Sequence, residues 1–233
     1  MIKLDKVSKK FGTGVFGLTD VSLFIDKGEF VFLVGPTGSG KTTILRLLIR
    51  DILPTEGSVV VSDFDVVNIK KSNLPALRKK VGVIFQDLKL LFDRTVSENV
   101  SLPLEVVGKK PEEATKLVDD VLEQVGLLDH KDKFPVQLSG GELQRVAIAR
   151  ALILSPEIIL ADEPTGNLDN DMSWEIINIL TDINKKGTTI LMATHNDDVI
   201  KALGKRVVYI EKGKIVKDEK GKKDSKKHKE EKE

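Results

Sequence analysis

Short apolar runs recur along the chain and predict the strands of a buried sheet. They are Phe30–Val34, Val81–Phe85, Ile158–Ala161 and Thr188–Met192. Each is four or five residues long, and each follows a charged residue or a glycine. Because these runs lack the polar alternation of a half-exposed strand, we expect both of their faces to be covered, as in the parallel strands of α/β proteins.

A second pattern, in which apolar and polar residues alternate, marks the two ends of the chain. In residues 1–30 it predicts strands that leave one face polar. Ser58–Val61 adds another strand after a turn, and Arg206–Val216 predicts a hairpin that turns at Lys212 and Gly213. These segments are expected to pair in antiparallel fashion.

Apolar residues three and four positions apart fill the segments between the buried runs and predict helices. Residues 87–136 are expected to be mainly helical, with breaks at Pro103 and Pro135. A chain of 233 residues in which strands and helices alternate predicts an α/β domain large enough to bury a core. The predicted helices follow Thr42, Pro111 and Ser139, and one more lies near residues 171–185.

Composition and charge exclude several kinds of function. A formal net charge of +1 gives no general attraction for nucleic acid. The absence of cysteine excludes disulfides, thiolate catalysis and Cys-ligated zinc. No apolar run approaches the roughly 20 residues that span a bilayer, and Met1–Lys6 has no apolar signal region. A role at a membrane is therefore expected to depend on another polypeptide.

The end of the chain differs from the rest. From Lys217 onward there is no hydrophobic residue, so residues 217–233 are expected to form a disordered charged tail after a domain that ends at residue 216. The tail's lysines suit contact with anionic lipid headgroups. Its interspersed acids favour a solubilising tail instead.

The segment Gly35–Thr42 has the spacing G-x-x-x-x-G-K-T between a predicted strand and a predicted helix. Its glycines let successive backbone N–H groups face one concavity, and the helix N-terminus adds a positive dipole. Lys41 is expected to neutralise the outer phosphates of a nucleoside triphosphate, and the Thr42 hydroxyl to hold Mg²⁺. The predicted contacts are Gly35, Pro36, Thr37, Gly38, Ser39, Gly40, Lys41, Thr42 and Thr43.

Polar residues follow three of the buried runs. Because the carboxyl ends of parallel strands meet at one edge of a sheet, we expect these residues to converge there. Gln86 is expected to touch Mg²⁺ or the attacking water, and Asp162 to bind Mg²⁺ opposite Thr42. Glu163 is expected to orient or deprotonate that water, and His195 to hydrogen-bond the γ-phosphate.

Ser139 and Glu142 have the spacing of a capping box ahead of a helix. Between them, Gly140 and Gly141 leave the first N–H groups open to close approach by an anion. The segment therefore predicts a well-capped helix, and the glycine pair adds the prediction of a second phosphate-binding helix start.

Phe11 lies in a basic turn near the end of the first predicted strand. An aromatic ring there could stack on adenine. A half-buried hydrophobe at a strand end explains the same residue equally well, so both interpretations stay open.

Over residues 1–216 these motifs resemble those of the ABC-type ATPases. The resemblance implies an α/β fold with a P-loop NTPase (RecA-like) core, an antiparallel β subdomain and an α-helical signature subdomain, the last inserted at roughly residues 87–155. It places Gln86 in the Q-loop, Asp162 at the end of Walker B and Glu163 as the catalytic glutamate. It makes His195 the switch histidine.

The same resemblance implies a head-to-tail homodimer with two ATP molecules between its subunits. It places Phe11 where adenine stacks, a position that more often holds tyrosine in this family. The signature motif would then contact the γ-phosphate bound by the partner's P-loop. The further residues implied to contact nucleotide are Ser139, Gly140, Gly141 and Glu142 of the signature motif and Asp169 of the D-loop.

Within that family, Phe85–Val100 resembles the FtsE-like cell-division ATPases, which pair with an FtsX-like integral membrane protein. Phe92–Thr95 carries this resemblance, which implies that the membrane partner docks near residues 87–100. The motifs at Asp162–Asp169 and Met192–His195 are shared with ATPases of lipoprotein release and macrolide export.

The function expected from the sequence is therefore an ATPase subunit that couples dimer closure to a membrane partner regulating cell-wall hydrolysis in cell division. Such a subunit would lie at the cytoplasmic face of the cell membrane, held there by its partner. The alternative is the ATPase subunit of a lipoprotein-release or macrolide-type exporter. A nucleic-acid factor of the same family is disfavoured by the neutral charge and by the lack of a coiled-coil insertion or a second ATPase half.

Overall fold

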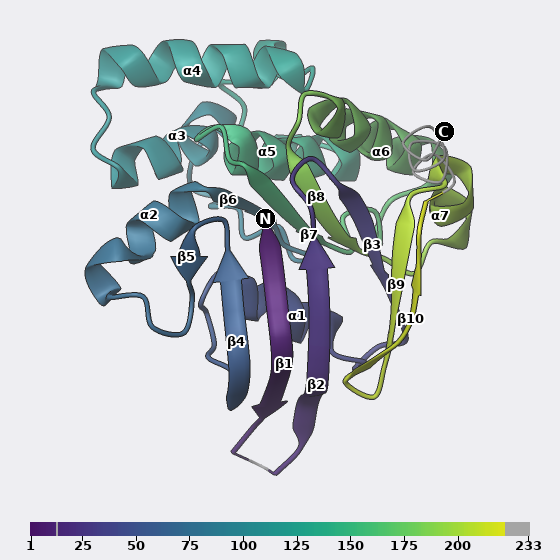
Figure 1. The fold of residues 1–233 in the computed structure, drawn as a ribbon. Coiled ribbons are helices and arrows are strands. Elements are labelled where there is room, and N and C mark those ends of the chain that lie inside the picture. The colour runs from purple at the N-terminus through teal and green to yellow at the C-terminus, as the bar shows by residue number, and fades with distance from the viewer. Residues whose placement is uncertain (13, 222–233) are drawn as a thin grey trace, which may run out of the picture.

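The computed structural model describes residues 1–12 and 14–221, and a six-stranded sheet lies at its centre (Figure 1). The sheet has the order β10-β9-β3-β8-β7-β6, and all its pairs are parallel except that of β10 with β9. The predicted parallel strands and the C-terminal hairpin are thus confirmed. The strands are β3 (Phe30–Val34), β6 (Val81–Ile84), β7 (Ile158–Asp162), β8 (Thr189–Ala193), β9 (Arg206–Glu211) and β10 (Lys214–Glu219).

Side chains that alternate along the central strands contribute to two separate cores. In β3, Phe30 and Phe32 pack with the helices, whereas Val31 and Leu33 pack on the opposite face. Residues of β7 and β8 divide between the two cores in the same way. This two-sided burial is the physical reason that β3, β7 and β8 are apolar except at their ends.

Helices cover one face of the central sheet and a second sheet covers the other (Figure 1). The second sheet is antiparallel, has the order β2-β1-β4-β5, and shares its core with α1. Its strands are β1 (Ile2–Lys10), β2 (Phe16–Ile25), β4 (Glu56–Val61) and β5 (Phe64–Asp65). The α-helices are α1 (Lys41–Leu48), α2 (Leu74–Lys79), α3 (Val96–Val106), α4 (Pro111–Gln124), α5 (Gly140–Leu152), α6 (Asn170–Lys185) and α7 (Asp197–Leu203). Short 3₁₀ helices are η1 (Lys71–Asn73), η2 (Leu128–His130) and η3 (Pro135–Gln137).

The expected helix break at Pro103 is wrong, because Pro103 lies inside α3. Proline removes one backbone hydrogen bond from a helix, but two other features hold α3 together. Thr95 forms a capping box at its N-terminus, and Val100 and Leu104 are fully packed in the helical core. Pro135, in contrast, begins the short helix η3, where a missing N–H costs nothing.

The expected start of the disordered tail at Lys217 is also wrong, because β10 continues through Glu219. Lys217 and Glu219 still pair with β9, opposite Tyr209 and Val207. The ordered domain therefore extends beyond residue 216. The remainder of the predicted tail, residues 222–233, lies outside the described residues.

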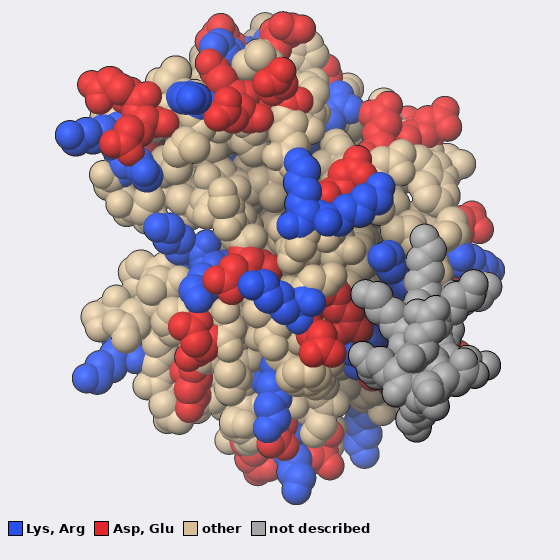
Figure 2. Space-filling model, turned by 45° about the horizontal axis from the view of Figure 1, so that its top comes forward, with Lys and Arg blue, Asp and Glu red and all other residues tan. Residues whose placement is uncertain are grey.

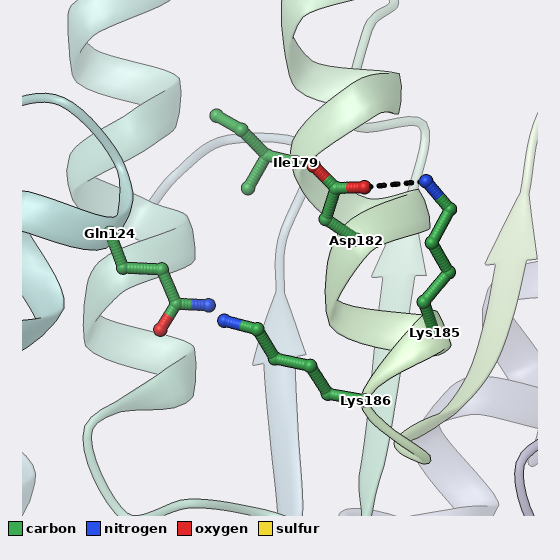
Figure 3. Close-up of a pocket in the computed structure, with 5 residues that line it drawn as sticks. All are labelled: Gln124, Ile179, Asp182, Lys185 and Lys186. Atoms are coloured by element: carbon green, nitrogen blue, oxygen red, sulfur yellow. Dashed lines mark hydrogen bonds and ion pairs between the residues drawn. The ribbon is translucent and has the colours of Figure 1, made fainter.

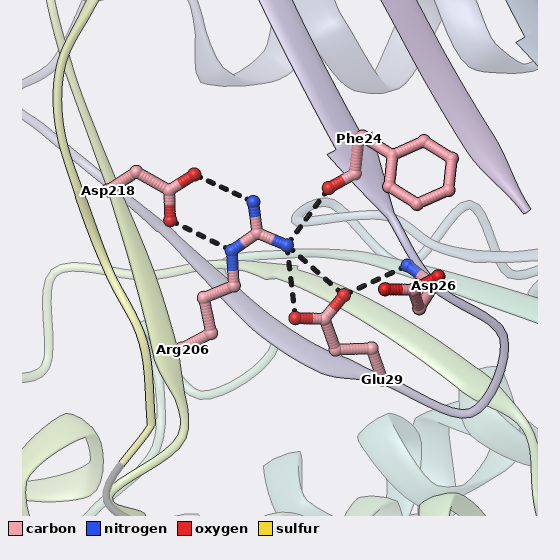
Figure 4. A network of polar contacts seen from close by, with 5 residues as sticks. All are labelled: Phe24, Asp26, Glu29, Arg206 and Asp218. Atoms are coloured by element: carbon pink, nitrogen blue, oxygen red, sulfur yellow. Dashed lines mark hydrogen bonds and ion pairs between the residues drawn. The ribbon is translucent and has the colours of Figure 1, made fainter. Parts of the chain in front are cut away.

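Ion pairs take the place of hydrophobic burial in this last strand (Figure 4). The guanidinium of Arg206 donates to both carboxylate oxygens of Asp218 at 2.7 and 2.8 Å. It also donates to Glu29 at 3.0 and 3.1 Å and to the Phe24 carbonyl at 2.9 Å. Hydrogen bonding to Asp218, and then to Glu29, raises the pKa of Arg206 further above its ordinary value. One arginine thus ties β10 to the segment between β2 and β3.

Candidate nucleotide-binding and active site

The glycine-rich loop between β3 and α1 requires the backbone freedom of glycine at several positions. Gly40 precedes α1 with a φ of 115°, a conformation that L side chains rarely adopt. A Cβ added at Gly40 would lie 2.8 Å from the Gly17 carbonyl oxygen, and one at Gly35 would lie 2.1 Å from that of Ile210. The loop is therefore packed tightly against neighbouring strands. The helix that follows it, α1, begins at the edge of the sheet.

Lys41 is buried and folds back over this loop. Its ammonium group donates to the carbonyl oxygens of Gly35 at 2.7 Å and Pro36 at 3.2 Å. It also lies 3.8 Å from the carboxylate of Glu163. The side chain predicted to meet phosphates is thus held at the loop by contacts that a phosphate group can replace.

Thr42 and Asp162 meet directly, as their predicted shared role requires. The Thr42 hydroxyl donates to Asp162 Oδ2 at 2.8 Å, although the two residues are 120 positions apart in the sequence. Asp162 is the last residue of β7 and is buried. A hydroxyl and a carboxylate are oxygen donors of the kind that Mg²⁺ prefers.

Glu163 occupies an uncommon backbone conformation just after β7. Its φ is 48°, and its N–H donates to the Ala193 carbonyl of the neighbouring strand β8 at 2.9 Å. From this position one carboxylate oxygen faces Lys41, and the other lies 2.8 Å from His195 Nδ1. The structure therefore joins Lys41, Glu163 and His195 into one polar chain at the carboxyl edge of the sheet.

Gln86 is not part of this contact network. It is exposed and follows β6, which is the edge strand of the central sheet. In the sheet, β8 and β7 lie between β3, which precedes the glycine loop, and β6. Gln86 is therefore about three strand spacings, or about 14 Å, from β3 across the sheet. Its predicted contact with Mg²⁺ or water stays a prediction.

The signature segment forms the predicted capping box. Ser139 is the N-cap of α5, and its N–H and hydroxyl each donate to Glu142 Oε2 at 2.7 Å. These bonds lower the pKa of Glu142 below its ordinary value. The Gly140 position is exposed, whereas a Cβ at Gly141 would lie 3.0 Å from Met172 Sδ of α6. Gly140 therefore has the open setting that an anion contact requires, and Gly141 also serves helix packing.

Two residues near this segment have structural roles that were not identified from the sequence. His130 Nδ1 lies 3.0 Å from Glu142 Oε1, in a contact whose angles do not satisfy those of a hydrogen bond. Asp169, expected to contact nucleotide, is the N-cap of α6 and accepts from the Met172 N–H at 2.8 Å. The His130 contact joins separate segments and has no local signal, whereas the cap is local, so an aspartate just before the helix predicted near residues 171–185 was the available signal.

A hollow of about 230 Å³ lies beside the glycine loop. Phe11 is half-buried, as one interpretation of this residue expects, and it lines this hollow, while its stacking on adenine stays a prediction. Phe16 lines it too, with 55% of its surface exposed, and was not identified from the sequence. A second phenylalanine five residues after Phe11 was the available signal. The lining residues are Phe11, Val15, Phe16, Gly17, Gly38, Gly40, Lys41, Thr42 and Thr43.

A larger hollow of about 380 Å³ lies between α4 and α6 and is separate from this site (Figure 3). Its carboxylate, on Asp182, is already paired with Lys185 at 2.8 Å. The other residues that line it are Gln124, Ile179 and Lys186. Because no candidate catalytic group converges there, the smaller hollow is the better candidate for a reacting nucleotide.

Residues 18–166 match the model of the ABC transporter family, and the chain belongs to this family of ATP-binding cassettes. It is therefore an ATP-binding protein and an ATPase.

Among its relatives are cell division ATP-binding proteins named FtsE. That of Bacillus subtilis (strain 168) is 47% identical over 219 residues, covering 94% of this chain and 96% of that protein. That of Mycobacterium tuberculosis (strain H37Rv) is 48% identical over 220 residues, covering 94% of this chain and 96% of that protein. That of Escherichia coli (strain K12) is 41% identical, covering 92% of this chain and 97% of that protein.

A solved structure also resembles the chain closely. The ATP-binding cassette MJ0796, a dimer in a post-hydrolysis state with ADP and Pi bound, superposes with a TM-score of 0.86 at 37% identity. The match covers 94% of this chain and 98% of that one. The ABC ATPase fold expected from the motifs is thus confirmed.

Proposed function

We propose that this protein binds ATP with Mg²⁺ and couples its hydrolysis to a membrane partner that acts in cell division. The observation that carries the proposal is the position of Glu163 between Lys41 and His195, beside the Thr42–Asp162 pair. Such a set of residues suits hydrolysis of a γ-phosphate, and the FtsE relatives supply the physiological context.

The chemistry assigns each residue a task. Lys41 exchanges its bonds to the loop carbonyls for bonds to phosphate oxygens, and Ser39 Oγ, which is buried and has no partner among the described residues, is available for another polar contact. Glu163 accepts the proton of the attacking water or orients it, and His195 fixes the outer side of that carboxylate.

The metal-binding side chains are proposed to be those of Thr42 and Asp162, with Gln86 as a further oxygen donor. Within residues 1–12 and 14–221 no group of three or more His, Asp or Glu residues is placed to hold a metal by itself. The protein thus offers a small set of oxygen ligands, which fits an ion that arrives with a nucleotide. Bound there, Mg²⁺ would neutralise charge on the phosphates.

The active unit is proposed to be a head-to-tail homodimer in which Ser139, Gly140 and Gly141 approach the γ-phosphate held by the partner's glycine loop. The dimeric state of the MJ0796 cassette supports this arrangement. The exposed helix start at Gly140 supports it from within this chain.

The membrane partner is proposed to resemble FtsX and to dock near residues 87–100, holding this subunit at the cytoplasmic face of the cell membrane. Leu91 and Phe92 are exposed apolar side chains within this segment, and Phe85 is exposed shortly before it. Among the described residues no helix is long and apolar enough to cross a bilayer. The face drawn in Figure 2 carries interspersed acidic and basic groups and lacks one dominant basic surface. The partner would in turn regulate cell-wall hydrolysis.

A substitution at Phe92 tests whether this segment binds the membrane partner. We expect Phe92→Asp to abolish co-purification of an FtsX-like protein from native membranes, because a charge would be buried in an apolar contact. Val216→Asp is the control, since Val216 is also exposed but lies on β10, at the opposite edge of the central sheet. Recovery of a lipoprotein-release or macrolide-export membrane subunit by the unmodified protein would favour the exporter alternative.

Phe11 and Phe16 both line the hollow that is proposed to hold the adenine ring. We expect Phe11→Ala and Phe16→Ala each to weaken binding of ATP, by about five- to a hundredfold, because base stacking contributes about 1–3 kcal/mol per aromatic ring. Binding of a fluorescent ATP analogue measures the effect. Phe24→Ala serves as control, since Phe24 is similarly exposed but does not line the hollow. An unchanged affinity in one of the two variants would remove that ring from the base site.

A further inference from the structure

The segment Leu88–Thr95, here named the docking loop, contains no helix or strand. Leu88 and Lys89 both have a φ of 53°. Successive left-handed residues other than glycine are unfavourable for L-amino acids, so this conformation needs support from outside the loop. The structure contains two such supports.

Arg150 of α5 provides the first. Its guanidinium donates to the Lys89 carbonyl at 2.7 Å through Nη1 and to the Leu88 carbonyl through Nη2. Burial lowers the pKa of Arg150. Among the described residues, the hydrogen bonds of its guanidinium go to these two carbonyls. A partly buried cation bonded only to loop carbonyls stabilises the two residues that are left-handed.

Asn99 of α3 provides the second. Its side chain is fully buried, with 0% exposure. Its carbonyl oxygen accepts from the Leu91 N–H at 2.8 Å. Its amide nitrogen lies within hydrogen-bond distance of the Leu91, Arg94 and Thr95 carbonyls, at 2.8, 3.1 and 2.9 Å. The buried Asn99 side chain thus provides hydrogen-bond partners for backbone N–H and C=O groups at both ends of a tight turn.

These contacts determine what the docking loop presents to a partner. Leu90 packs in the helical core, while Leu91 and Phe92 remain 38% and 57% exposed. Two apolar side chains are thus held outward on a supported backbone, which lowers the ordering cost of binding. The helix that supplies Arg150 is the same helix whose first turn contains Gly140 and Gly141.

We propose that Arg150 and Asn99 are positioning residues that preform the docking loop, and that Arg150 makes the loop follow the movements of the signature helix α5. The part concerning α5 rests on the proposed function. In this arrangement a nucleotide contact at the start of α5 is transmitted along a rigid helix of 13 residues to the carbonyls of Leu88 and Lys89.

Hydrogen exchange of the full chain tests the support itself. In Arg150→Met, which keeps an unbranched apolar stem but removes the two donors, amides of residues 88–91 should exchange at least about tenfold faster. The matched control is Arg145→Met, on the same helix, because Arg145 pairs with Glu175 of α6 at 2.6 Å and does not touch the loop. Arg150→Lys should give an intermediate rate and covers the case in which Arg150→Met fails to fold. Loop exchange at the unmodified rate in both Arg150 variants would overturn the proposal.

The coupling is tested by adding ATP to the same proteins carrying Glu163→Gln. With Arg150 present, exchange in peptides of both residues 138–145 and residues 87–92 should change on ATP binding. In Arg150→Met only the first peptide should respond, a split that general destabilisation would not produce. A docking-loop response that persists without Arg150, or is absent with it, overturns the coupling. Because no membrane partner is used, the result is independent of the Phe92 capture experiment.

Discussion

Replacement of Glu163 by glutamine is expected to lower steady-state ATP hydrolysis by at least about a hundredfold while ATP binding is retained. Glutamine has the same size and can still hydrogen-bond His195, but it cannot accept a proton from water. Lys41 loses its ion pair with Glu163 but keeps its bonds to the loop carbonyls, and the Thr42–Asp162 pair, proposed to bind the ion, is untouched. Phosphate release measures the rate of hydrolysis, and equilibrium binding of a labelled nucleotide measures whether ATP binding is retained.

The same variant should also accumulate as an ATP-bound dimer, because closure would no longer be followed by cleavage. Size-exclusion chromatography with ATP and with ADP distinguishes the two states. Asp182→Asn is the matched acid-to-amide control, since Asp182 lies in the separate hollow between α4 and α6. Hydrolysis at the unmodified rate in Glu163→Gln would remove Glu163 from its proposed role.

The location of the site followed from the sequence because it depends on a topological regularity. Parallel strands end at one edge of a sheet, so Asp162, Glu163 and His195 could be placed near the glycine loop without knowing any contact. The capping box at Ser139 was equally visible because it is local. Strand type was predictable for a related reason, since burial on both faces removes polar residues from the strand itself.

The contacts that the sequence did not predict depend on the docking of segments far apart in the chain. Arg206 stabilises the charged strand β10 through Asp218 and Glu29, so a criterion based on hydrophobic residues ended the domain too early. Pro103 remains in a helix because core packing outweighs the lost hydrogen bond. Arg150 carries no local motif at all, and only the folded chain shows that it reaches the loop after Gln86.

The proposed head-to-tail dimer predicts a strong effect of charge at the first residue of the signature helix. A Cβ at Gly140 would lie 3.5 Å from Leu168 Cδ2, an ordinary contact, so side chains fit there without displacing the fold. Aspartate at the first turn also suits the helix dipole. Gly140→Asp should therefore fold well but repel the γ-phosphate and reduce hydrolysis by more than about tenfold. Gly140→Ala, which adds a methyl group but no charge, is the comparison and should lower hydrolysis less than Gly140→Asp does.

Mixing Gly140→Asp with Lys41→Met then tests whether the two motifs act between subunits. Each variant alone should be nearly inactive, because every dimer would carry its defect in both sites. In a mixed dimer, one site combines the intact glycine loop of one subunit with the intact signature motif of the other. About half of randomly paired dimers are mixed and each has one good site, so hydrolysis should recover to about a quarter of the unmodified rate. If the motifs instead acted within one subunit, no pairing of these two variants would contain an intact site, and the mixture would show only the average of its inactive components.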